Sequence, residues 1–122
     1  MADANQDLTQ FLPLTEAAFH ILLALAGEEK HGYAIMLEVE QISEGQVTIG
    51  PGTLYGTIKR LLKDGLIVES EERPDPEMDD QRRRYYQLTA LGQKVLKAEA
   101  QRLARLVTQA RTRQVLGQPA RH

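Results

Sequence analysis

The stretch Val-Thr-Ile-Gly-Pro-Gly-Thr-Leu-Tyr-Gly, residues 47–56, and the pattern that follows it constrain the fold more than any other part of the chain. Apolar side chains recur at helical spacing over residues 54–62, and Asp64-Gly65 supplies a stop. Pro51 suits the first turn of such a helix because its missing N–H group would have no intrahelical partner there. We therefore expect a helix over about residues 51–63, preceded by a very short strand at residues 47–49.

The two sides of this predicted helix differ in chemistry. On a helical wheel, one side carries Leu54, Ile58, Leu61 and Leu62, and the opposite side carries Gly52, Gly56, Lys59, Arg60 and Lys63, with Thr53 and Tyr55 towards its edges. Small side chains let a DNA backbone come close, and lysine and arginine bind phosphates or guanine edges. Free N–H groups and the positive end of the helix dipole favour a phosphate at its start. The pattern suits a helix that lies in a DNA major groove, but a surface helix with solvated lysines shows it too, and the arginines of the following hairpin favour the DNA interpretation.

The glycines also allow a nucleotide-binding interpretation. Gly50, Gly52 and Gly56 imitate a dinucleotide fingerprint, but their spacing is G-x-G-x-x-x-G and the chain before them is helical in pattern. No Gly-Lys-Ser/Thr follows, which excludes a Walker loop. A nucleotide-binding or other small-molecule domain therefore stays as the less favoured alternative.

The remaining pattern predicts two further helices and a hairpin before the last helix. Thr15 is a plausible N-cap for a helix that ends by Gly27, and Gly32 opens a short helix that stops near residues 43–45. Residues 66–68 and 82–88 read as two strands, joined by a proline-rich acidic tip at residues 73–80 that we expect to be mobile. The return strand begins with Arg82-Arg83-Arg84. A helix-turn-helix followed by a basic hairpin is a winged helix, so the fold class is mainly α with a small β-hairpin (α+β).

A long final helix is predicted from Thr89, as its N-cap, to about Leu116. Spacings of four and three along it form a heptad seam, which is typical of a helix that packs on another helix; the seam residues are Leu96, Ala100, Leu103, Val107 and Ala110. Leu91 and Val95 lie off this seam and can face the domain. Because the seam has no obvious partner within the chain, we expect a homodimer. The expected organisation is a flexible arm (1–13), a winged-helix domain (14–90), a dimerisation helix (91–116) and a tail (117–122).

Charge and composition limit the function classes. The net charge is −2, but it is unevenly distributed. Residues 51–65 hold three basic side chains and one acidic side chain, and residues 81–122 hold ten basic side chains and one acidic side chain. Local charge governs phosphate binding, so nucleic acid stays possible. Cysteine is absent, and no apolar run reaches the length of a membrane span, so we expect a soluble intracellular protein without a membrane partner. His20 and His31 lack a second ligand cluster, and Glu69, Glu71 and Glu72 lack a pocket-forming partner. We therefore predict no metal, no cofactor and no catalytic residue.

Five motifs in order resemble the PadR family of bacterial transcriptional regulators: TEAAFHILLAL from Thr15, HGYAI from His31, GTLYGTIKRL from Gly52, DGLI from Asp64 and RYYQLTALG from Arg84. The resemblance covers about residues 12–116. It implies a cytoplasmic, nucleoid-associated winged-helix DNA-binding protein, dimeric through its last helix, which usually represses a nearby gene until a small effector relieves it. It further implies DNA contacts by Thr53, Tyr55, Lys59 and Arg60 on the recognition helix, by Arg83 and Arg84 in the wing, and a supporting or phosphate contact by Tyr33.

The hairpin departs from the family pattern in its tip. Family wings often turn through a glycine next to basic residues, whereas this tip carries Asp75, Glu77, Asp79 and Asp80. Acidic groups beside phosphates are unfavourable, so we expect DNA contact by the wing only at its base. A protein-interaction adaptor that uses the acidic tip and the long helix is the other alternative to a DNA-binding regulator.

Overall fold

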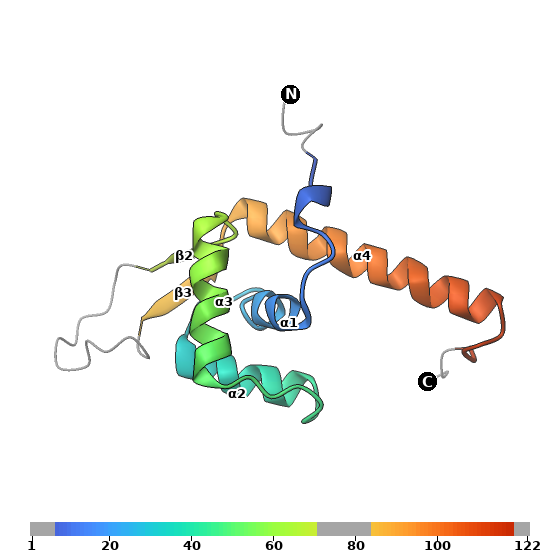
Figure 1. Cartoon of the computed structure of the whole chain (residues 1–122), viewed down its shortest axis with the longest axis horizontal. Helices are drawn as coiled ribbons and strands as arrows, with labels where there is room; N and C mark the ends of the chain where they lie inside the picture. The colour runs from blue at the N-terminus through green and yellow to red at the C-terminus, as the bar shows by residue number, and fades with distance from the viewer. Residues whose placement is uncertain (1–6, 71–83, 119–122) are drawn as a thin grey trace.

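A computed structural model describes residues 7–70 and 84–118, and all structural statements refer to these ranges. It contains four α-helices and three short strands (Figure 1). Their bounds are α1 Glu16–Ala24, β1 Lys30–His31, α2 Gly32–Ile42, α3 Pro51–Lys63, β2 Ile67–Glu69, β3 Tyr85–Leu88 and α4 Ala90–Thr112. The predicted α+β class is confirmed.

Helix α1 lies in the middle of the domain, with α2, α3 and α4 packed around it (Figure 1). It begins where Thr15 accepts a hydrogen bond from the Ala18 N–H at 3.0 Å, which confirms Thr15 as its N-cap. Its Ile21 and Leu22 side chains have no exposed surface. Because a nine-residue helix is too short to be stable alone in water, this burial is what holds it helical.

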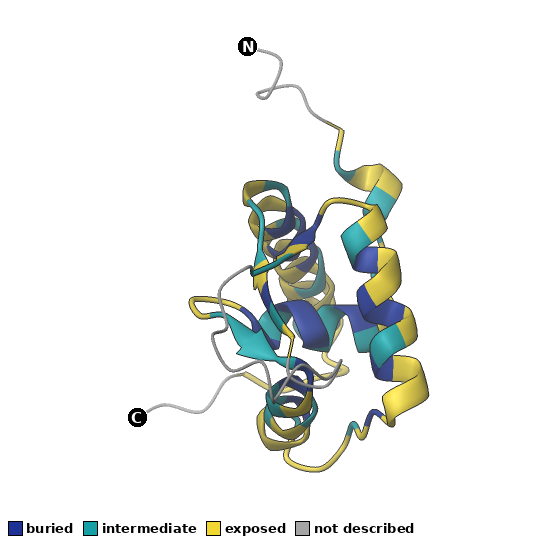
Figure 2. Ribbon diagram, turned by 90° about the vertical axis from the view of Figure 1, so that its left-hand side faces the viewer, coloured by how far each residue is buried: buried dark blue, intermediate teal, exposed yellow. Residues whose placement is uncertain are grey.

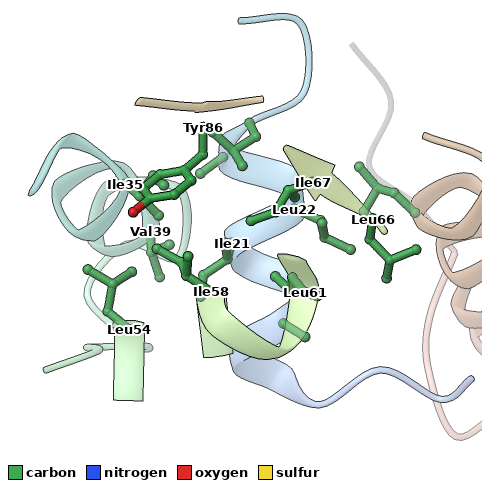
Figure 3. Close-up of a cluster of buried hydrophobic side chains, with 14 of the residues drawn as sticks. Ile21, Leu22, Ile35, Val39, Leu54, Ile58, Leu61, Leu66, Ile67 and Tyr86 are labelled. Carbon is green, nitrogen blue, oxygen red and sulfur yellow. The ribbon is translucent and has the colours of Figure 1, made fainter. Parts of the chain in front are cut away.

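Helix α3 has the two sides that the sequence predicts. Leu54, Ile58 and Leu61 are buried, and Figure 3 shows them directed towards Ile21 and the other core side chains. The helix ends at Lys63, where Asp64 is the C-cap and Gly65 adopts a left-handed φ of 77°. The predicted stop is therefore confirmed.

The sheet has one strand more than the predicted hairpin. Its order is β1-β3-β2, and both pairings are antiparallel. The additional strand, β1, has two residues and pairs Lys30 with Tyr86 and His31 with Tyr85. Of the two adjacent tyrosines, Tyr86 is 2% exposed and points into the core (Figure 3), as the alternation of a strand requires. The predicted strand at residues 47–49 is absent, because Val47 is held by the Ser43 hydroxyl and Ile49 turns into the core.

The hairpin and α4 meet at a very close contact. A Cβ atom built on Gly92 would lie 1.9 Å from the Leu66 carbonyl oxygen, so only glycine fits there. Thr89 begins α4 as its N-cap by accepting from the Gly92 N–H at 3.0 Å, and its hydroxyl donates to the Gly65 carbonyl at 2.6 Å. This confirms the predicted N-cap and ties the start of α4 to the loop after α3.

Helix α4 packs on the domain with its first half and extends past it with its second half (Figure 1). Val95 is fully buried and Leu96 is 8% exposed, both within the core. The assignment of Leu96 to the seam is therefore corrected, because its side chain is used inside the domain, and the boundary at residue 90 does not separate two packing units. The helix ends at Thr112 and not near Leu116, since Gln114 takes a left-handed φ of 64°.

Glu99 joins α4 to the N-terminal segment. It is the only acidic residue of residues 81–122, and it is 2% exposed. Its carboxylate accepts two hydrogen bonds from the Arg102 guanidinium, at 2.6 and 3.0 Å, and one from the Leu14 N–H at 3.1 Å. Leu8, Phe11 and Leu12 of the same segment pack against the core, with a 3₁₀ turn at Thr9–Phe11. Residues 7–13 are therefore not a free arm as predicted.

The charge on Glu99 makes the stability of the fold depend on pH. Its hydrogen bonds from Arg102 hold the pKa of Glu99 below the ordinary value of 4.5, and the Leu14 N–H acts in the same direction against the opposing effect of burial. Because the folded pKa is the lower one, this contribution is complete above about pH 4.5 and is lost as the pH falls through the folded pKa.

We predict that Glu99→Gln lowers the free energy of unfolding most at pH 7 and progressively less towards pH 3. Urea unfolding at several pH values measures the difference from the wild type. Glu40→Gln, at an exposed position on α2, is the matched control and should show a small difference that does not vary with pH. A Glu99→Gln difference that is constant over this range would contradict the assignment.

Candidate nucleic-acid interface

One side of α3 is open to solvent over the whole length of the helix. Its exposed residues are Pro51, Gly52, Thr53, Gly56, Lys59, Arg60 and Lys63, and we call this set the α3 face. Figure 2 shows the exposed and buried sides of the helix alternating as it turns. Within residues 7–70 and 84–118, no carboxylate forms an ion pair with Lys59, Arg60 or Lys63. The predicted basic side is therefore present, with its three cations directed to solvent.

The two glycines of the α3 face are not required by the fold. Neither Gly52 nor Gly56 has a positive φ, and a Cβ at either position would meet no described atom within 4 Å. Glycine inside a helix costs about 0.5–1 kcal/mol relative to alanine. Gly92 contrasts with both, since the space of its missing side chain is filled by the Leu66 backbone. The α3 face thus keeps two destabilising glycines that leave open space above the helix.

The first turn of α3 is open as well. Gly50 is the N-cap and supplies no side-chain acceptor, so the N–H groups of Gly52 and Thr53 receive no cap from it. Gly50 and Pro51 are exposed. Unsatisfied N–H groups at the positive end of a helix dipole attract an anion. The arrangement places these donors and the basic side chains along the same helix.

Tyr55 does not belong to the α3 face. Its side chain is half-buried with the hydroxyl oxygen inside the protein, and it lies so close to α2 that a Cβ on Gly32 would be 2.5 Å from that oxygen. The prediction that Tyr55 contacts DNA is therefore corrected, because its ring packs between α3 and the start of α2. Its position at the edge of the wheel allowed either direction, and only the packing of α2 decides between them.

The base of the wing carries one described arginine. Arg84 directly precedes β3, its side chain is 51% exposed, and its Nη1 atom lies 3.2 Å from the Glu69 carboxylate on β2. The predicted contact Arg83, the arginine before it and the acidic tip lie outside the described residues. Tyr33 is 50% exposed in the first turn of α2, so its side chain is accessible to a phosphate.

The distal half of α4 presents apolar side chains that the domain does not cover. Leu103 is half-buried, Leu106 is 45% exposed and Val107 is 38% exposed, and Ala110 lies one turn further on the same side. The heptad pattern missed Leu106 because it lies on the other flank of the seam, three residues after Leu103. Ala100 is exposed at the side of this stripe. We call Leu103, Leu106, Val107 and Ala110 the α4 stripe.

Other types of site find little support in the described part of the chain. A cavity of about 170 Å³ lies between the N-terminal segment and the end of α3, lined by residues that include Phe11, Arg60 and Leu66. A second hollow, of about 350 Å³, lies near the end of α4 and is lined by Thr108, Arg111, Thr112 and Gln118. Neither lining includes Gly50–Gly52, so neither hollow supports the nucleotide-binding alternative. No group of three metal-binding side chains occurs in residues 7–70 and 84–118. In the same ranges, no helix is both long and apolar enough to cross a membrane.

Comparison with known proteins gives a family match. Residues 21–98 match the PadR-like family of transcriptional regulators. The chain is 37% identical over 98 residues to the transcriptional regulator Rv3488 of Mycobacterium tuberculosis, which covers 80% of each protein. It is also 38% identical over 91 residues to an uncharacterized 37.1 kDa protein in transposon TN4556 of Streptomyces fradiae. That match covers 75% of this chain and about a quarter, 24%, of the transposon protein.

The same fold occurs in Bacillus subtilis PadR, solved in complex with operator DNA. That structure aligns with a TM-score of 0.58 at 18% identity over 90% of this chain and 52% of the other. At this identity the likeness concerns the fold alone. The helix order and the three-stranded antiparallel sheet are thus those of a winged helix.

The contrast between the two kinds of glycine predicts opposite effects of the same substitution. We expect Gly56→Ala to raise the free energy of unfolding by about 0.5–1 kcal/mol, because the added methyl group meets open space and alanine favours the helix. Gly92→Ala is the matched comparison and should lower it by about 1–3 kcal/mol or more, because the methyl group collides with the Leu66 backbone. Urea denaturation measures both. A destabilising Gly56→Ala would show that the fold does require this glycine.

Proposed function

The chain belongs to the PadR-like family of transcriptional regulators, and on this premise we propose that it binds double-stranded DNA through the α3 face as a homodimer. Such a protein acts on transcription by occupying DNA and not by catalysing a reaction. The observation that carries the proposal is the α3 face itself, in which Gly52 and Gly56 leave space for a close neighbour and Lys59, Arg60 and Lys63 supply positive charge beside it.

The geometry suits a major groove. Its width of about 12 Å admits one α-helix, and the helix must bring backbone and short side chains close to the DNA. Gly52, Thr53 and Gly56 allow that approach at the start of α3, where first-turn N–H groups can also bind a phosphate. Lys59, Arg60 and Lys63 then reach phosphates, or the O6 and N7 atoms of guanine, from the later turns.

The wing adds a second contact. Arg84 is half-exposed at the base of the hairpin, where a side chain can reach the phosphates that flank the groove. Glu69 occupies one of its donors, and a guanidinium has five, so a phosphate can be bound without breaking the pair. We assign the wing contact to Arg84 and, from the sequence alone, to Arg83.

Binding through these cations should depend steeply on salt. We predict that Lys59→Gln with Arg60→Gln reduces the slope of log affinity against log salt concentration by about 0.9 for each phosphate that the dimer no longer binds. The measurement is a salt titration by fluorescence anisotropy on a duplex selected from a randomised pool. Lys97→Gln, an exposed lysine on α4, is the control and should keep the slope. An unchanged slope in the double variant would argue for a binding surface elsewhere.

The α4 stripe supports the homodimer. Leu106 and Val107 are 45% and 38% exposed, and with Leu103 and Ala110 they continue the side of α4 that buries Val95 and Glu99 on the domain. A second copy of α4 would cover them by helix-on-helix packing. Two α3 faces related by a twofold axis would then reach successive major grooves about 34 Å apart, which requires a palindromic operator.

Charge in the α4 stripe should separate the protomers. We expect Leu103→Glu and Leu106→Glu each to yield monomers in sedimentation velocity, with DNA affinity falling at least tenfold because the two half-sites are no longer bound together. Val115→Glu, at a position 80% exposed beyond the helix, is the control and should stay dimeric. Dimers in both stripe variants would place the interface on another surface.

Occupying an operator that overlaps a promoter would exclude RNA polymerase, so we propose that the protein acts as a repressor in the cytoplasm. Relief by a small effector is part of the same proposal, by analogy with the family pattern that the five motifs follow.

A further inference from the structure

His31 lies where the wing, α2 and α3 come together. It is the second residue of β1, where it pairs with Tyr85 of β3, and the next residue begins α2. Its neighbour Gly32 is buried under the Tyr55 ring of α3. The sequence His-Gly-Tyr at residues 31–33 therefore joins the wing to α3 through the start of α2, and the wing and α3 are the two elements that the proposed function brings to DNA.

Among the described residues, two contacts of the His31 ring differ in kind. Its Nδ1 atom accepts a hydrogen bond from the Ala34 N–H at 3.1 Å and so caps α2, a position where asparagine or serine is more usual. Because Nδ1 is the acceptor, the neutral ring carries its proton on Nε2. The ring also meets the Tyr85 ring edge to face, with centroids 5.3 Å apart and planes at 87°.

The second contact reaches the wing directly. Tyr85 follows Arg84, and the Arg84 guanidinium donates a hydrogen bond to the Glu69 carboxylate on β2. The sheet alone gives β1 only two residue pairs with β3, so few backbone bonds hold the base of the wing to the start of α2. The ring pair adds a side-chain contact at the first residue of β3, directly after Arg84.

We propose that His31 is a positioning residue, which fixes the base of the wing relative to the helix-turn-helix so that Arg84 and the α3 face engage DNA together. This inference rests on the proposed DNA binding. Groups that are already held in their bound arrangement lose less conformational freedom on binding. Without the ring contact, α3 would still enter the groove, but Arg84 would no longer be held at the flanking phosphates.

Two substitutions separate the two contacts of the ring. His31→Asn keeps a side-chain acceptor for the cap of α2 and removes the ring that meets Tyr85. His31→Phe keeps an aromatic edge for Tyr85 and removes the acceptor. Arg84→Gln removes the wing cation itself and gives the reference change in the salt dependence of DNA affinity. All are made in the full chain and titrated with salt on the same selected duplex.

We expect His31→Asn to reduce the slope of log affinity against log salt by the same amount as Arg84→Gln, about 0.9 for each phosphate that is no longer bound. His31→Phe should keep the wild-type slope, while its melting temperature falls by several degrees because the cap of α2 is missing. The slope separates positioning from stability, because partial unfolding lowers the active fraction without changing the number of phosphates bound. Adding His31→Asn to Arg84→Gln should reduce the slope no further.

A His31→Asn protein with the wild-type slope would overturn this inference and leave the proposed function standing. The same holds for equal reductions of the slope in His31→Asn and His31→Phe, because the ring contact would then not be the cause. A wild-type protein whose affinity does not depend on salt would instead overturn the proposed function, and the role of His31 with it.

Discussion

The packing of the other helices on α1 is the interaction on which the rest of the structure depends. Ile21 and Leu22 have no exposed surface, and α2, α3 and α4 each contact this nine-residue helix. Because Leu54, Ile58 and Leu61 are buried in that core, the opposite side of α3 faces solvent. The position of the α3 face is therefore a consequence of how α3 is buried, and the same core anchors α4 through Val95 and Leu96.

The charged side chains follow the same separation between the core and the exposed side of α3. The net charge of −2 says little, because the basic residues of α3 are directed away from the domain, whereas Glu99, the single carboxylate of residues 81–122, is taken inside. There it binds Arg102 and the N-terminal segment, and it stabilises the fold while leaving no negative charge on the exposed side of α4. The fold thus takes the one acidic residue of residues 81–122 inside and presents the cations of α3 where the proposed function requires them.

Much of the fold could be predicted because its signals are local. The caps at Thr15 and Thr89, the stop at Gly65 and the two sides of α3 depend on residues within one or two turns of each other. The missed features depend on distant contacts. β1 has only two residues and exists because β3 pairs with it, Tyr55 turns inwards because Gly32 leaves space, and Leu96 is buried because α4 packs on the core around α1. For the same reason, the basic side of α3 could be predicted, whereas the direction of Tyr55 and the packing of α4 could not.

The central claim is that the α3 face lies in a DNA major groove, and protection of guanine N7 atoms from methylation tests it most directly, because N7 is accessible only from that groove. On the selected duplex, we expect two protected clusters about one helical turn, 10–10.5 base pairs, apart, and their disappearance in Lys59→Gln with Arg60→Gln under conditions where the DNA is still bound. Bound DNA in which every guanine N7 of the site stays as reactive as in free DNA would contradict the account.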